Sequence, residues 1–462
     1  MIYRIYGKAH KTAKKVLKRI SKPQYRLVNV SPLDMFDGVL SVTEKDRSVF
    51  FNEKSIKNGL IPKHEVFPLE NVVQEHSFGR LEDSHTPTKK DLSFGVISEQ
   101  ATDFWKRFID NSKIPPGYRN AGLSYAGYIL DTQSWCLPSW IWTNAALVRM
   151  YCKCGDINQA INIADRLITL QRPEGSWIVR FDYDSYGVKP ICAPNDSAYI
   201  ANNALLELFL ITNNKKYLDA AELCGRWIIK TARPDGLVYV GYNLNDYGWQ
   251  KQYNIVDIGF TAALFCRLYQ LTKKTEYMFF VDRFIQRYIE CFYIPNKGFG
   301  TSLDEKDKRI GGMFGRGQAW ALEGLIPYYC LTRDNKVRAV INCTVKLLLQ
   351  KQSKAGGWPY NITRPLMGID CKATPIIAWS LWKWYELNPN RVDCLRAVQK
   401  AIKWCEKHTA NSGSAIGGIF SYSTEGAIVH NMYTSTAFVY SCAYATEIVE
   451  SLKGRINDLP KQ

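Results

Sequence analysis

Residues 171–177 read QRPEGSW, a turn-forming stretch between two segments with helical patterns. Four later stretches resemble it: ARPDGLV at 232–238, IPNKGFG at 294–300, QSKAGGW at 352–358 and GSAIGGIF at 413–420. The glycines Gly175, Gly236, Gly298, Gly357 and Gly418 of these stretches follow one another at steps of 61, 62, 59 and 61 residues. A period of this length indicates that one structural unit is repeated along the chain.

The repeated unit is a pair of helices. Each turn follows a long amphipathic pattern, such as INQAINIADRLITLQ at 157–171, and precedes a loop and a second, more apolar helical segment. The second helices are expected to begin near Trp135, Asp196, Asp257, Arg316, Asp370 and His430. Six such pairs predict an all-α fold, the (α/α)6 barrel or six-hairpin toroid, over residues 96–455. The apolar last segment STAFVYSCAYATEIV at 435–449 indicates that the ring closes, because an open solenoid needs a polar cap.

The chain before the barrel is expected to have two parts, a basic arm over residues 1–26 and an irregular extension over residues 27–95. The arm accounts for much of the net charge of +17, because residues 1–23 contain eight basic and no acidic side chains. Apolar side chains recur there at three- and four-residue steps, which predicts an amphipathic helix on an anionic membrane surface. The alternatives are a solvated tail or a helix that packs on the barrel.

Several other functions are disfavoured by the sequence. The 13 cysteines include only one close pair, Cys152 and Cys154, whose spacing is poor for zinc, so they are expected to be reduced thiols. No secretory signal, transmembrane run, metal-ligand spacing or phosphate loop is recognised, and no cofactor is expected. Nucleic-acid binding is disfavoured because no recognised module appears. These features predict a cytoplasmic enzyme, peripheral on the inner face of the membrane if the arm binds there.

Two inner segments begin with an aspartate, DSAYIANNAL at 196–205 and DIGFTAALFC at 257–266. In the predicted barrel, the N-terminal ends of all inner helices meet at one mouth. Asp196 and Asp257 would therefore form a carboxylate pair on adjacent walls, as general acid–base chemistry on sugars requires. The alternative is that each aspartate is a helix N-cap, a role for which this residue type is well suited.

The other candidates at the mouth are aromatic, polar and cationic side chains that suit a carbohydrate pocket. Arg316 lies between two glycines and could bind a carboxylate with two hydrogen bonds, or could instead pair with Glu323. The substrate-binding candidates are Arg316, Gln318, Trp320, Trp135, Trp140, Trp142, Trp249, Asp370, His430 and Tyr433.

The stretch GMFGRGQAWALEGLIPYY at 312–329 resembles the RGQAW segment of unsaturated glucuronyl hydrolases, glycoside hydrolase family 88, which is related to family 105. The resemblance implies that Asp257 is the general acid/base, which protonates C4 of a 4,5-unsaturated uronic acid and activates water for addition at C5. It also implies that Asp196 assists Asp257, that Arg316, Gln318 and Trp320 lie along the sugar, and that the partner is an acidic oligo- or polysaccharide.

Two other functions remain open. The same stretch also resembles the GMAQGQA segment of glucuronyl C5-epimerases, so a membrane-associated biosynthetic epimerase or a lyase is an alternative. In that chemistry a base removes the C5 proton and a tyrosine or carboxylate returns it. The third possibility is a non-catalytic polysaccharide-binding protein, in which removal of the aspartates would have no effect.

Overall fold

The computed structural model describes residues 50–51, 64–65, 99–117, 120–129, 134–136, 140–184, 187–363, 369–420 and 436–457. The predicted membrane-binding arm, and all but four residues of the predicted extension, lie outside these ranges. Within the extension, the strands β1 (Phe50–Phe51) and β2 (His64–Glu65) pair antiparallel. None of the helices in the described ranges combines the length and the hydropathy needed to cross a membrane.

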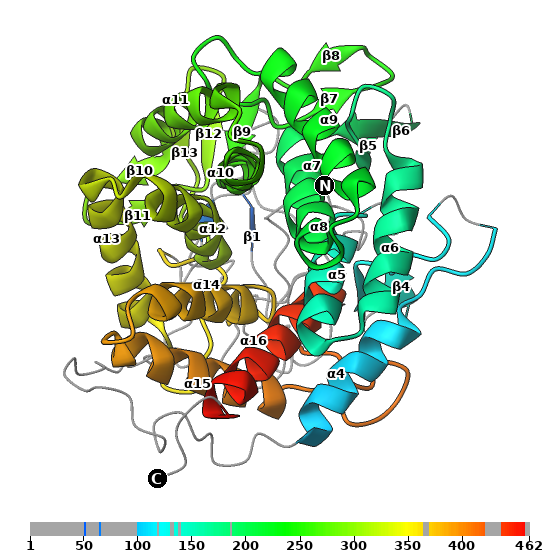
Figure 1. Cartoon of the computed structure of the whole chain (residues 1–462). Helices are drawn as coiled ribbons and strands as arrows, with labels where there is room; N and C mark the ends of the chain where they lie inside the picture. The colour runs from blue at the N-terminus through cyan, green and yellow to red at the C-terminus, as the bar shows by residue number, and fades with distance from the viewer. Residues whose placement is uncertain are drawn as a thin grey trace.

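The described helices form two concentric rings (Figure 1). The outer helices are α4 (Glu99–Asn111), α6 (Ile157–Leu170), α9 (Lys215–Thr231), α11 (Thr275–Phe292), α13 (Asn335–Lys351) and α15 (Val392–Lys407). The inner helices are α5 (Thr143–Cys154), α7 (Pro194–Ile200) with the π-helix η2 (Ala201–Leu206) and α8 (Glu207–Thr212), α10 (Phe260–Thr272), α12 (Gly315–Thr332), α14 (Ala373–Leu387) and α16 (Val439–Asn457). The predicted (α/α)6 barrel is confirmed.

The ring closes where the last repeat meets the first. Helix α16 packs on α5 and on α4. The glycine of the last turn reinforces this closure, because Gly417 has a positive φ of 86° and a Cβ there would collide with the carbonyl oxygen of Phe104 in α4. Only glycine combines this backbone conformation with such a close approach.

Except between α13 and α14, where the described residues form isolated β-bridges only, short strands connect each outer helix to the next inner helix. They are β3 (Gly127–Ile129), β4 (Ser134–Cys136), β5 (Ile178–Asp184), β6 (Gly187–Cys192), β7 (Tyr242–Asn243), β8 (Gly248–Trp249), β9 (Tyr253–Ile255), β10 (Tyr293–Ile294), β11 (Gly298–Phe299), β12 (Ser302–Asp304), β13 (Arg309–Ile310) and β14 (Thr436–Phe438). They form antiparallel sheets in the orders β14-β3-β4, β5-β6-β7-β8, β13-β12-β9 and β10-β11. Because most of these strands precede an inner helix, the sheets surround the N-terminal mouth of the barrel.

Two predicted details of the repeat are wrong. The first inner helix begins at Thr143 rather than near Trp135, because Ser134–Cys136 forms the strand β4. The last one begins at Val439 rather than near His430. In the last two repeats the turn residue is the first glycine of each pair, because Gly356 and Gly417 have the positive φ values that Gly175 also has.

The turn of the first repeat is built like that of a later one. The Gln171 side chain donates to the carbonyls of Gly175 and Ala220, and Gln352 donates in the same way to Gly356 and Ala397. In both repeats the side-chain amide therefore ties its own turn to the following outer helix.

Candidate active site

Asp196 and Asp257 lie on neighbouring walls of the mouth. Asp196 is the third residue of α7, and Asp257 is the second residue of the short 3-10 helix η3 (Val256–Gly259), which packs against α7. Three residues further along each chain segment, the rings of Tyr199 and Phe260 are in contact, with centroids 4.9 Å apart. The two aspartates therefore lie on adjoining elements, each three residues before one of these two rings.

Neither aspartate is a helix N-cap. The residue in that position is Ala193 for α7 and Ile255 for η3, and neither element has a side-chain cap. Aspartate caps do occur in this protein, but on outer helices: Asp156 accepts from the amide of Gln159, and Asp334 caps α13. The capping alternative for the two mouth aspartates is therefore wrong.

Asp196 is buried, with 8% of its surface exposed, and its Oδ1 accepts a hydrogen bond from Asn195 Nδ2 at 3.0 Å. Asp257 is half-buried, and its charge contributes, after the larger effect of burial, to raising the pKa of the neighbouring Tyr288 hydroxyl. The Tyr288 hydroxyl donates to the carbonyl of Val256 at 2.7 Å. This bond connects outer helix α11 to η3, the element that carries Asp257, and so supports the position of the aspartate.

Arg316 pairs with Asp370 rather than with Glu323. Both side chains are buried, and Arg316 Nη1 lies 3.1 Å from Asp370 Oδ2. The Arg316 guanidinium also lies over the rings of Phe314 and Tyr360, at 4.5 and 4.7 Å from their centroids. Cation–π contacts of this kind stabilise a charge that has lost its water. The other oxygen of Asp370 accepts from the amide of Lys372 and so holds the start of α14.

Lys372 is a second buried cation at the mouth, and the sequence analysis missed it. Only 4% of its surface is exposed, and its ammonium lies 4.9 Å from the Trp140 ring, 4.8 Å from the Phe438 ring and 5.5 Å from the Tyr440 ring. A lysine among apolar residues at a helix start is a signal that the sequence did contain. Its three aromatic partners, however, come from two other repeats, Trp140 from the first and Phe438 and Tyr440 from the last.

An aromatic belt lies beneath these polar groups. It consists of Trp140, Trp142, Tyr199, Phe260, Trp320, Phe438 and Tyr440, in which successive rings have centroids 4.9–6.4 Å apart. The predicted candidates Trp140, Trp142 and Trp320 are thus brought together. The mouth therefore combines carboxylates and cations with flat apolar faces, which suits a sugar ring. Burial raises the pKa of the Tyr440 hydroxyl well above its ordinary value, so this group stays protonated.

Three of the predicted substrate-binding residues instead pack against, or form hydrogen bonds with, other parts of the protein. Trp135 lies on β4 and packs against Phe108 of outer helix α4, with ring centroids 5.0 Å apart. Trp249 lies on β8, in an aromatic cluster with Tyr239 and with Trp227 of outer helix α9. Gln318 is fully buried: its amide accepts from Phe299 N and donates to the carbonyls of Phe299 and Phe314, so its role is structural. His430 and Tyr433 lie outside the described residues.

No group of three or more His, Cys, Asp or Glu side chains in the described ranges is arranged to hold a metal ion. The twelve cysteines whose side chains are described are all free thiols.

No protein-family model and no protein of curated function matches the sequence. Solved structures do match the fold. An unsaturated glucuronyl hydrolase specific for heparin is 15% identical, with a TM-score of 0.60 over 80% of this chain and 98% of that one. The unsaturated glucuronyl hydrolase of Streptococcus agalactiae is 12% identical, with a TM-score of 0.57 over 84% and 98%.

A D-mannose isomerase matches as well, at 11% identity and a TM-score of 0.59, over 78% of this chain and all of the other. The predicted resemblance to unsaturated glucuronyl hydrolases is thus confirmed at the level of the fold. At these identities the likeness does not extend to the reaction, and the same barrel holds both hydrolases and an isomerase.

Proposed function

We propose that this protein is a carbohydrate-active enzyme whose substrate is a uronic-acid-containing glycan bound at the mouth. The observation that carries the proposal is the pair Asp196 and Asp257, placed on packed neighbouring elements in positions where neither acts as a helix cap. An aromatic belt lies below the pair. The likeness in fold to two unsaturated glucuronyl hydrolases supports the same proposal.

The reaction we propose is hydration of a 4,5-unsaturated uronide. Asp257 in its acid form donates a proton to C4, and the resulting carboxylate takes a proton from the water whose oxygen bonds to C5. One water molecule is added across the double bond, and Asp257 ends in the form in which it began. The hydrated sugar then rearranges, and this breaks the glycosidic bond. Asp196 holds the sugar hydroxyls and tunes its neighbour.

The buried cations provide the selectivity for an acidic sugar. Arg316 is held by Asp370, and Lys372 is surrounded by aromatic rings, so both charges are placed before a substrate arrives. A carboxylate that replaces water near such charges gains a strong interaction because the surroundings are poorly polarisable. A neutral sugar of the same shape gains none of this energy.

The epimerase alternative would require a tyrosine or carboxylate to exchange the C5 proton. Burial raises the pKa of Tyr199 and of Tyr440 well above the ordinary value, so neither phenol is suited to act as a base. This observation disfavours Tyr199 and Tyr440 as the base that removes the C5 proton, whereas an exchange carried by the aspartates is distinguished from hydration by the assay that follows.

The test is an ultraviolet assay with an unsaturated uronyl disaccharide, run with the wild-type chain and with Asp257→Asn. A hydratase removes the conjugated double bond, so absorbance should fall with the wild type alone. A lyase given an intact polyuronide would instead raise the absorbance. An epimerase would leave it constant and introduce solvent deuterium at C5. Constant absorbance with both substrates, together with no deuterium uptake, would mean that the chain is a non-catalytic polysaccharide-binding protein.

A further inference from the structure

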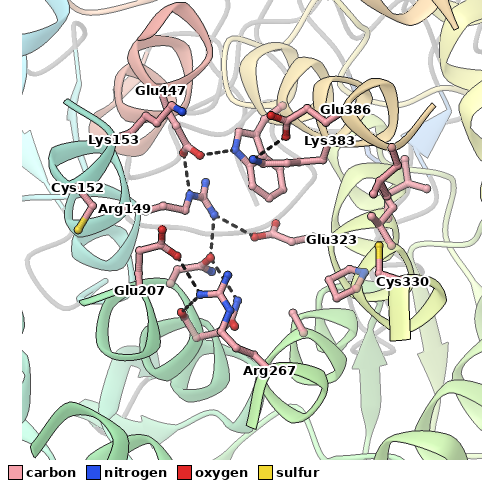
Figure 2. A pocket seen from close by; sticks show the side chains of 18 of the residues that line it. Arg149, Cys152, Lys153, Glu207, Arg267, Glu323, Cys330, Lys383, Glu386 and Glu447 are labelled. Carbon is pink, nitrogen blue, oxygen red and sulfur yellow. Dashed lines mark hydrogen bonds and ion pairs between the residues drawn. The ribbon is translucent and has the colours of Figure 1, made fainter. Parts of the chain in front are cut away.

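A pocket lies between the inner helices, away from the first turns that form the mouth, and Figure 2 shows the side chains that line it. The mouth is formed by the first turns of the inner helices, whereas this pocket is lined by their later turns. Its floor consists of Arg149, Asn203, Ala263, Glu323, Trp379 and Glu447. Charged side chains one turn further out, among them Lys153, Glu207, Arg267 and Lys383, surround the opening. The cavity measures about 440 Å³, within the range of small-molecule sites.

The floor of the pocket is held rigidly. Arg149 Nε lies 2.7 Å from Glu447 Oε2, and Arg149 Nη1 donates to Asn203 Oδ1 at 2.8 Å. Trp379 Nε1 donates to the other Glu447 oxygen at 2.8 Å, and the Arg149 guanidinium lies 4.2 Å from the centroid of the Trp379 ring. A preformed floor of this kind lowers the entropy cost of binding a ligand.

The charges around the pocket leave one cation unmatched. Arg267 pairs with Glu207 at 2.9 Å, and Lys383 pairs with Glu386 at 2.9 Å. In the part of the chain that the structure describes, exposed Lys153 has no carboxylate partner. The remaining carboxylate, Glu323, lies 3.5 Å from Arg149, and burial raises its pKa to about 7, so it carries only part of a charge at neutral pH. Lys153 can therefore pair with one further negative charge at the opening of the pocket.

The same pocket also contains hydrogen-bond acceptors. The π-helix η2 widens the inner helix at Asn202, whose carbonyl accepts from Arg267 Nη1 and whose buried Oδ1 has no donor among the described residues. Such π-helical turns occur frequently at functional sites. Glu207 and Glu386 each accept one bond from a cation, and a carboxylate has further lone pairs to offer. These acceptors suit the hydroxyl groups of a ligand.

We propose that this pocket is a second binding site, for a small hydroxy acid that carries one carboxylate on a hydroxylated carbon chain. The carboxylate pairs with Lys153, and the hydroxyls donate to Asn202, Glu207 and Glu386. The apolar wall of Leu322, Ile326 and Pro327 packs against the C–H groups. The inference is independent of the reaction at the mouth, because the two sites share no side chain.

Calorimetric titration of the full chain tests this site with D-gluconate and with D-glucitol, which has the same carbon chain but no carboxylate. Gluconate should bind, and glucitol should bind at least tenfold more weakly. Lys153→Gln should weaken gluconate binding tenfold or more, and Lys153→Arg should restore it. The matched control is Lys230→Gln, on the exposed last turn of outer helix α9, which should bind as the wild type does.

A mouth variant separates this site from the proposed active site. Asp257→Asn should bind gluconate with unchanged affinity, whatever its effect on the ultraviolet assay. The proposal is overturned if gluconate gives no heat at about 10 mM, if glucitol binds equally well, or if Lys153→Gln binds as the wild type does. Loss of binding in Asp257→Asn would also overturn it, because the ligand would then lie at the mouth.

Discussion

The ion pair between Arg149 and Glu447, 2.7 Å long, joins the first inner helix to the last one. Both side chains are buried, and no other residues of α5 and α16 form an ion pair with each other in the described ranges. Removal of one partner from a buried pair leaves an uncompensated charge. The closure of the inner ring therefore depends on an electrostatic contact as well as on apolar packing.

Glu447→Ala should lower the free energy of unfolding by up to about 3–5 kcal/mol, the usual cost of breaking a buried ion pair, since Glu323 at 3.5 Å would be the one carboxylate left beside Arg149 among the described residues. Urea denaturation followed by far-ultraviolet circular dichroism measures this loss. Glu450→Ala, on the same helix, removes the partially exposed pair with Lys453 and should cost less than about 1 kcal/mol. Equal losses in the two variants would mean that burial does not set the strength of the Arg149 pair.

Glu323→Gln should change how stability depends on pH. Burial, and the nearby charge of Glu447, raise the pKa of Glu323 from 4.5 to about 7, against the opposing effects of Arg149 and Tyr444. Between these two values the folded state binds more protons than the unfolded state, so this group's contribution to stability falls as the pH rises. Glutamine has no such dependence. From pH 5 to pH 8 the variant should therefore gain about 3 kcal/mol relative to the wild type. Parallel urea curves at both pH values would contradict this prediction.

Asp257→Asn should lower kcat for the unsaturated disaccharide by a factor of about 10² to 10⁴, the usual contribution of a general acid–base group. Asp334→Asn is the matched control, because Asp334 caps an outer helix and asparagine caps equally well. The control should keep its kcat and its melting temperature. A similar kcat in Asp257→Asn and the wild type would show that Asp257 is not the general acid–base group of the reaction.

Lys372→Met should raise KM for the acidic disaccharide at least tenfold while changing kcat less, because the variant keeps the side-chain volume and removes the charge. Steady-state kinetics at several salt concentrations measures both constants. Lys354→Met, at an exposed position in a turn, serves as the control and should leave both unchanged. If KM stays at the wild-type value in Lys372→Met, this ammonium does not contact the substrate's carboxylate.

Gly417→Ala should destabilise the barrel more than Gly413→Ala does. Both glycines have a positive φ, which costs an alanine roughly 1–2 kcal/mol. A Cβ at Gly413 meets open space, whereas one at Gly417 meets the Phe104 carbonyl. The difference between the two melting temperatures measures the cost of opening this contact. Identical melting temperatures would show that the last turn adapts freely.

The sequence was sufficient to predict the barrel because the repeat is expressed locally, in amphipathic periods and turn glycines. It also placed Asp196, Asp257 and Arg316 near the starts of inner helices, where the structure has them. It could not place Trp135, because a two-stranded pairing decides the conformation there rather than a local pattern. The partner of Arg149 lies 298 residues away, so no local spacing could identify that pair.

Buried side chains that contact one another between the inner helices limit the path that a polymeric substrate could take. Below the aromatic belt, the hydroxyls of Tyr199 and Tyr444 meet at 2.8 Å, and Tyr444 also donates to Glu323. Among the described residues, these buried groups lie between the aromatic belt and the pocket lined by Glu323, and they fill the space between the inner helices there. If a glycan binds at the mouth as proposed, these groups would prevent the strand from passing between the inner helices to the pocket, so its product would leave on the side from which the substrate entered.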